Sequence, residues 1–135
     1  ERARRKIGRA AALADYFFPR AEDAEALSGL KDPDAQVDWA HGLGAKNVFL
    51  KLGKDGVVVS DGRQRTRLKG HKVKAVDGTG AGDCFCGAAL ARLAAGDSLV
   101  EAARYGNAAA ALKTTGYGAV APIPSPRAVR ALLRK

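Results

Sequence analysis

The chain has 135 residues and an apolar fraction of 47%, enough for one domain with a buried core. Its net charge of +9 suits an anionic partner such as a nucleotide, a phosphosugar or a nucleic acid. No apolar run approaches the roughly 20 residues of a membrane span, and the basic opening stretch lacks the apolar segment of a signal peptide. Cys84 and Cys86 stand too close together for an easy disulfide. With only two thiols and no export signal, a reducing cytoplasm is the expected location.

Helices and strands are predicted to alternate along the chain, an order typical of a layered α/β fold. Asp32 or Asp34 is expected to cap the third helix, and Pro126 suits the first turn of the last one. In chain order we expect a helix over 2–14, a strand over 16–18, helices over 21–28 and 34–43, strands over 47–52 and 57–60, an extended segment over 63–76, and helices over 83–95, 99–113 and 126–134.

Residues 77–83, with the sequence DGTGAGD, form the most informative segment. Three glycines within five positions let the backbone approach a ligand closely, and a helix follows at once. The first N–H groups of a helix have no internal acceptor, so this turn predicts a phosphate-binding site. Asp83 could be a simple helix cap, or a general base beside the bound phosphate. Neither a Walker A motif nor a complete GxGxxG is present, so a P-loop or dinucleotide fold is not supported.

Three motifs in this order resemble the C-terminal half of ribokinase-like (PfkB-family) carbohydrate kinases. They are KLGKDG at 51–56, DGTGAGD followed by Cys84 and Phe85, and AARYGNAAA at 102–110 with Gly118, Ala119 and Pro122 downstream. The resemblance covers nearly all of the chain. It implies that residues 1–135 are a single partial domain, the nucleotide-binding half of a three-layer α/β/α sandwich.

The resemblance implies roles for the matching residues in transfer of the ATP γ-phosphate to a sugar hydroxyl. Asp83 would deprotonate the hydroxyl, and the backbone amides of an anion hole would hold the phosphate. The anion hole would consist of Gly80, Ala81 and Gly82, and the ATP-binding residues would be Lys51, Gly53, Gly56 and Asn107. From the residues alone, Lys51 could instead be a surface lysine of a strand, and Asn107 could face a neighbouring helix.

The resemblance implies that the cofactors are ATP, Mg²⁺ and K⁺. It also implies two cation sites. Asp23 would reach Mg²⁺ through water, although Arg20 and Asp23 here replace the Asn and Glu of the family's Asn-x-x-Glu motif. An aspartate before a glycine, as at position 77, could equally be a turn former. The monovalent-cation site would comprise Asp77 and Thr79 with backbone carbonyls near Lys113, Gly116 and Gly118.

Within the family, the motifs KLGxxG, GAGDCF and TTGYGAVAPIP look most similar to kinases that act on 2-dehydro-3-deoxygluconate (KDG). A fructokinase or ribokinase is the alternative substrate class. The resemblance also implies a homo-oligomer formed through an N-terminal lid that lies outside this chain, and little activity for the isolated fragment.

Two other classes of protein compete with a kinase. The positive charge suggests a nucleic-acid-binding module, but aromatic side chains are not interleaved with the basic ones for base stacking, so no nucleic-acid partner is expected. No membrane partner is expected either. A non-catalytic structural or nucleotide-binding α/β module would predict that Asp83 is dispensable.

Overall fold

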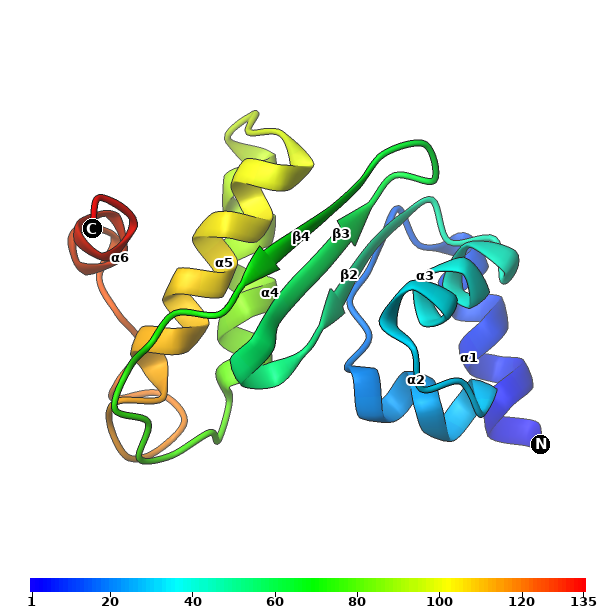
Figure 1. Ribbon diagram of the computed structural model, residues 1–135, viewed down its shortest axis with the longest axis horizontal. Helices are drawn as coiled ribbons and strands as arrows, with labels where there is room; N and C mark the ends of the chain where they lie inside the picture. Colours follow the sequence, from blue (N-terminus) through cyan, green and yellow to red (C-terminus); the bar gives the residue numbers. More distant parts are fainter. The chain divides into compact units, whose positions relative to one another are not determined.

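The computed structural model describes residues 1–135, and its helices and strands are labelled in Figure 1. The chain forms two compact units, which are described separately. The first unit comprises Glu1–Gly53 and Val57–Arg67, and the second comprises Lys54–Gly56 and Leu68–Lys135. No helix in the chain combines the length and the apolar character that a membrane crossing requires.

A four-stranded sheet in the order β1-β2-β3-β4 organises the first unit. β1 runs parallel to β2, and β2 pairs antiparallel with β3, which confirms the predicted strand pair. The predicted extended segment 63–76 is a strand only over β4. The elements from the N-terminus are α1 (Arg2–Leu13), β1 (Tyr16–Phe17), α2 (Ala21–Ser28), α3 (Pro33–Gly42), β2 (Asn47–Lys51), a 3₁₀ turn at Gly53–Asp55, β3 (Gly56–Ser60) and β4 (Arg65–Lys69).

The core of the first unit lies between this sheet and two helices. Val48 and Leu50 of β2 and Val58 of β3 are almost fully buried. They pack with Ala24 of α2 and with α3, whose apolar residues Val37 and Ala40 face the same cluster. Burial of such side chains contributes about 1.5–3 kcal/mol for each large apolar residue.

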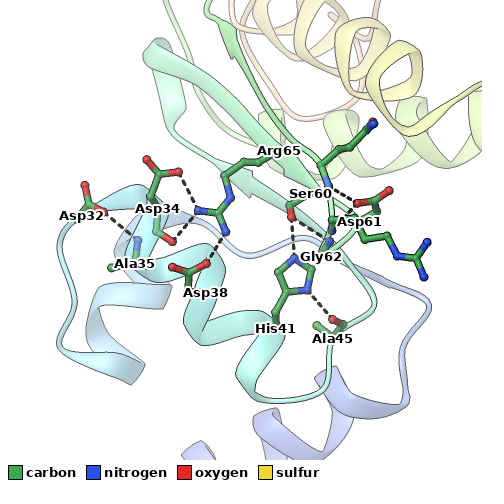
Figure 2. A network of polar contacts seen from close by, with 12 residues as sticks. Asp32, Asp34, Ala35, Asp38, His41, Ala45, Ser60, Asp61, Gly62 and Arg65 are labelled. Carbon is green, nitrogen blue, oxygen red and sulfur yellow. Dashed lines mark hydrogen bonds and ion pairs between the residues drawn. The ribbon is translucent and has the colours of Figure 1, made fainter.

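Polar contacts tie α3 to the ends of β3 and β4, as Figure 2 shows. His41 Nδ1 lies 2.9 Å from the carbonyl oxygen of Ala45, and Nε2 lies 2.8 Å from Ser60 Oγ. A carbonyl only accepts, so Nδ1 carries a proton and donates to Ala45, while Nε2 and the Ser60 hydroxyl form the second hydrogen bond. Arg65 of β4 forms ion pairs with two aspartates on α3, Asp34 and Asp38. These contacts fix the helix against the sheet edge.

The second unit is built on a helical hairpin. It contains α4 (Ala81–Ala94), α5 (Leu99–Lys113) and α6 (Pro126–Leu133). A Cβ at Gly106 of α5 would lie 3.0 Å from the carbonyl oxygen of Phe85 and 3.3 Å from Ala89 Cβ, so the missing side chain lets α4 and α5 approach closely. Val129 of α6 is buried against Ala108 and Ala109 of α5. The candidate site lies at this hairpin, since Asp83 belongs to α4.

Side-chain caps set the starts of three helices. Asp32, Ser98 and Ser125 accept hydrogen bonds from backbone N–H groups at the starts of α3, α5 and α6. The predicted cap at Asp32 is therefore confirmed, with Pro33 in the first turn. The predicted start of α4 at residue 83 is wrong: the helix begins two residues earlier and is preceded by Gly80.

Candidate active site

The turn before α4 is shaped by Gly80, which adopts the left-handed conformation at φ 75°. Glycine reaches this region without the Cβ penalty that other residues incur. The Ala81 N–H donates to the Gly78 carbonyl at 3.1 Å, and the Cys84 N–H donates to the Gly80 carbonyl at 2.9 Å. The N–H groups of Gly80, Gly82 and Asp83 have no acceptor within the protein. The free donors at the positive end of α4 therefore form an arrangement suited to an anion.

Asp83 is the third residue of α4 and is exposed. Asp83 is not the capping residue of α4, because Gly80 holds that position. The helix-cap role that the sequence allowed for Asp83 is therefore ruled out. Asp83 lines a cavity of about 470 Å³ within the second unit and is the only charged residue among those that form it. Most of the cavity wall is apolar and comes from α4, α5 and residues 119–126. A single carboxylate beside free amides is suited to accepting a proton from a group that reacts next to a bound anion.

Asp77 joins the glycine turn to the loop that follows α5. Its carboxylate accepts hydrogen bonds from the N–H of Thr79 at 2.9 Å and from the N–H of Gly118 at 2.8 Å. The N–H of Thr79, then that of Gly118, are the main reasons why the pKa of Asp77 falls from its ordinary value of 3.8 to about 2. The N–H groups of Val76 and Asp77 both donate to the Thr114 carbonyl. The Asp77 side chain thus connects the glycine turn to the loop after α5.

The stability contributed by Asp77 is expected to depend on pH. Because the folded pKa lies below the ordinary value, the contribution is present above about pH 4 and is lost as the pH falls towards about 2. Urea unfolding of wild type and Asp77→Asn should therefore show a difference in free energy of unfolding at about pH 6 that shrinks at about pH 2.5. A difference that stays constant over this range would contradict the ionised role of Asp77.

Four residues of the predicted monovalent-cation site come together in the structure. Asp77, Thr79 and Gly118 are joined by the hydrogen bonds above, and Lys113 Nζ donates to the Asp77 carbonyl at 3.1 Å. Gly116 lies in the same loop, where a Cβ would approach Pro122 to 2.6 Å. The prediction involved only the backbone near Lys113. The buried position of its ammonium group had no signal in the sequence, because a lysine in the last turn of a helix is usually solvated.

Lys51 and Asp23 lie in the first unit and influence each other electrostatically. Both oxygens of Asp23 accept hydrogen bonds from the Arg20 guanidinium, at 2.8 Å each. This contact with Arg20 is the leading reason why the pKa of Asp23 is lowered, and Lys51 adds to the effect. No group of three or more His, Cys, Asp or Glu side chains gathers as a metal-binding cluster. Asp23 is therefore arranged as an ion-pair partner and does not fit a Mg²⁺ site as it stands.

The KLGKDG turn contains two glycines with positive φ, Gly53 at 59° and Gly56 at 106°. A Cβ on Gly56 would lie 1.9 Å from the Leu68 carbonyl oxygen, and one on Gly70 would lie 1.8 Å from the Lys54 carbonyl oxygen. Residues 54–56 and 68–70 therefore pass in backbone contact. The requirement for glycine at position 56 is explained by this contact within the second unit, whether or not a nucleotide also approaches there.

Asn107 lies on α5 and is 8% exposed. Its side-chain amide donates to the carbonyl oxygen of Lys69, which belongs to the same unit, at 2.8 Å. The contact gives Asn107 a structural role, although the partner is a strand residue and not the neighbouring helix that the sequence left open. Its assignment to ATP binding remains a prediction.

The sequence profile of the pfkB family carbohydrate kinases matches residues 1–126. Ribokinase from Staphylococcus aureus (strain COL) is 36% identical over 118 residues, covering 83% of this chain and 39% of that protein. The 2-dehydro-3-deoxygluconokinase of Bacillus subtilis (strain 168) is 36% identical over 116 residues, covering 85% and 36%. The crystal structure of aminoimidazole riboside kinase from Salmonella enterica, complexed with aminoimidazole riboside and an ATP analogue, has a TM-score of 0.90 and 30% identity over 98% of this chain and 46% of that one.

The chain therefore belongs to the pfkB family of carbohydrate kinases. Its fold is the ribokinase-like α/β fold, which confirms the predicted fold class. The chain spans less than half the length of the curated relatives it matches, 39% of the ribokinase and 36% of the 2-dehydro-3-deoxygluconokinase.

Proposed function

We propose that the complete protein transfers the γ-phosphate of ATP to a hydroxyl of a sugar, with Asp83 as the general base. The observation that carries this proposal is the position of Asp83 at the start of α4. The carboxylate is exposed beside free N–H groups and borders an apolar cavity. The pfkB family membership supports the same reaction.

In the proposed reaction, an Asp83 carboxylate oxygen accepts the proton of the sugar hydroxyl. The hydroxyl oxygen forms a bond to the γ-phosphorus as the bond from that phosphorus to the β–γ bridging oxygen breaks, and its electron pair leaves with ADP. The N–H groups of Gly80, Gly82 and Asp83 donate to the oxygens of the transferring phosphoryl group. Positioning and neutralisation of charge are the main contributions of a protein to such a transfer.

ATP is proposed as the phosphoryl donor, and the phosphates would approach the positive end of α4. The apolar cavity offers room for the nucleotide base, because ligand pockets of roughly 300–1,000 Å³ commonly hold groups of this size. Mg²⁺ bound to the phosphates would shield their charge. Arg20 already pairs with both oxygens of the Asp23 carboxylate, so Asp23 holds no metal in the proposed reaction.

The proposed sugar is 2-dehydro-3-deoxygluconate. The motifs TTGYGAVAPIP and GAGDCF support this choice, as does a 2-dehydro-3-deoxygluconokinase at 36% identity. A ribokinase is 36% identical as well, so ribose is the competing substrate. We also propose a cytoplasmic location, consistent with two free thiols, and a homo-oligomer in the complete protein. The isolated chain is expected to bind nucleotide poorly and to be inactive.

The experiment that tests this function is ATP-dependent phosphorylation by the complete protein with KDG, ribose, fructose and adenosine, followed as ADP release. The proposal expects a kcat/KM for KDG at least about tenfold above that for each other substrate, since specificity is a ratio of these values. If ribose or fructose were the preferred substrate, the proposed sugar would be wrong, and the proposal that the protein is a sugar kinase would stand. No turnover with any of them would overturn the kinase proposal.

A further inference from the structure

Lys113, in the last turn of α5, is completely buried. Its Nζ donates to the backbone carbonyl oxygen of Asp77 at 3.1 Å, which satisfies one of its three N–H donors within the protein. Placing an ammonium group out of water costs several kcal/mol unless nearby negative charge and acceptors offset it. A lysine at this position therefore destabilises the fold unless its charge interacts favourably with groups nearby.

The groups around the ammonium of Lys113 identify what its charge acts on. The Asp77 carboxylate is the negative group that it attracts, and this attraction is one of the causes that lower the pKa of Asp77. The thiol of Cys84, on the first turn of α4, also lies within its electrostatic reach, although burial is the larger effect and raises the pKa of that thiol. The positive charge thus lies at Asp77, the residue that begins the glycine turn, and within electrostatic reach of Cys84 on α4.

A chain of contacts connects Lys113 to the proposed phosphate site. The ammonium binds the carbonyl of Asp77, and the carboxylate of Asp77 binds the N–H groups of Thr79 and Gly118. Thr79 directly precedes Gly80, the residue that sets the direction of the free N–H groups at the start of α4. Lys113 therefore acts on the anion site by positioning Asp77 and does not touch the substrate itself.

The same contacts disagree with the monovalent-cation site that the sequence resemblance implies. The two carboxylate oxygens of Asp77 already accept N–H donors, and its carbonyl oxygen already accepts the ammonium. A K⁺ ion at these oxygens would lie close to the buried ammonium group of Lys113, and the two like charges would repel each other. The residues as arranged do not fit a K⁺ ion.

We propose that the Lys113 ammonium is a built-in monovalent cation that positions Asp77 and the glycine turn, so that this protein needs no dissolved K⁺. Like K⁺, an ammonium group carries one positive charge and interacts well with carbonyl oxygens. Because the lysine is covalently attached, the site stays charged at any salt composition. The activity measurement below rests on the kinase function proposed above, whereas the unfolding measurement does not.

The test compares chloride salts of K⁺, Na⁺ and choline at equal ionic strength, using the complete protein. Wild type should keep the same unfolding temperature, and its kcat/KM for ATP should change by less than about twofold among the salts. Lys113→Ala leaves space for a small cation. Its kcat/KM for ATP should fall by about tenfold or more in choline, because misplacement of a reacting group is costly, and should recover in K⁺ or methylammonium.

Two further variants complete the test. Lys113→Met fills the space without charge, so K⁺ should neither restore its activity nor raise its unfolding temperature. Lys74→Ala removes a charge from an exposed lysine of the same unit and should behave as wild type in every salt. Lys113→Ala should also show an unfolding temperature that rises in K⁺ but not in choline, since a cation that binds only the folded state stabilises it.

Several results would overturn the proposal. One is a wild-type kcat/KM or unfolding temperature that rises strongly when K⁺ replaces choline, which needs no variant to observe. Another is a Lys113→Ala variant whose losses are the same in every salt, since that result would show a purely structural side chain. If no substrate is turned over, the kinase proposal fails, and the unfolding temperatures alone decide the role of Lys113.

Discussion

Asp83→Asn in the complete protein is expected to lower kcat by about 10²–10⁴-fold, the usual contribution of a general base. The carboxamide has nearly the same size and leaves the backbone of α4 unchanged, but it does not accept the proton of the sugar hydroxyl. KM for ATP should change little, because the N–H groups that face the phosphates belong to the backbone. Steady-state kinetics with the preferred sugar measure both quantities.

Glu101→Gln is the matched control for Asp83→Asn. It removes one negative charge from an exposed position on α5, where Glu101 lies 3.9 Å from Arg104 in a surface ion pair. Such pairs contribute little, so its kcat should equal that of wild type. Urea unfolding of both variants shows whether they are folded. An Asp83→Asn variant with wild-type kcat would show that Asp83 is not the base and would favour a non-catalytic nucleotide-binding module.

Gly56→Ala is expected to destabilise the protein by about 2–6 kcal/mol. This range is the sum of the cost of a side chain at positive φ and the cost of an overpacked contact. At φ 106° any L-residue is strained, and the new Cβ would overlap the Leu68 carbonyl oxygen at 1.9 Å. The backbone on both sides must then move apart. The free energy of unfolding in urea measures the effect.

Gly53→Ala separates the two causes of that loss. Gly53 also has a positive φ, 59°, but a Cβ there would meet nothing within 4 Å. Its cost should be limited to the conformational strain, about 1–3 kcal/mol, and should be clearly smaller than that of Gly56→Ala. Equal losses in the two variants would show that the close backbone contact does not matter.

Local signals in the sequence predicted most elements correctly. The helices predicted over 99–113 and 21–28 have the observed bounds of α5 and α2, and Gly29 follows the end of α2. The start of α4 was misplaced since Gly80 precedes the helix without any capping side chain. At the end of the segment after β4, Val76 and Asp77 donate to Thr114, a distant partner that no local pattern reveals.

The candidate site was only partly predictable. The glycine turn and Asp83 belong to one contiguous motif, so the sequence predicts that they lie next to each other. The ion pair of Asp23 with Arg20 depends on side-chain direction, although the two residues are three apart. The family resemblance grouped Asp77 with Lys113 and Gly118, which lie 36 and 41 positions away, but it did not indicate the direct hydrogen bonds between them. Contacts over such distances depend on the packing of α4 and α5, which the sequence pattern does not describe.

The helical hairpin also bears on the order in which the second unit folds. α4 and α5 are consecutive in the chain, and the Arg92–Asp97 ion pair closes the short connection between them. Contacts between segments near in sequence form quickly because little chain entropy is lost in closing them. The bond from Gly118 to Asp77 spans the whole hairpin, so we expect it to form only after the two helices have docked. The glycine turn would then be among the last parts of this unit to become ordered, and among the first to open when the protein fluctuates.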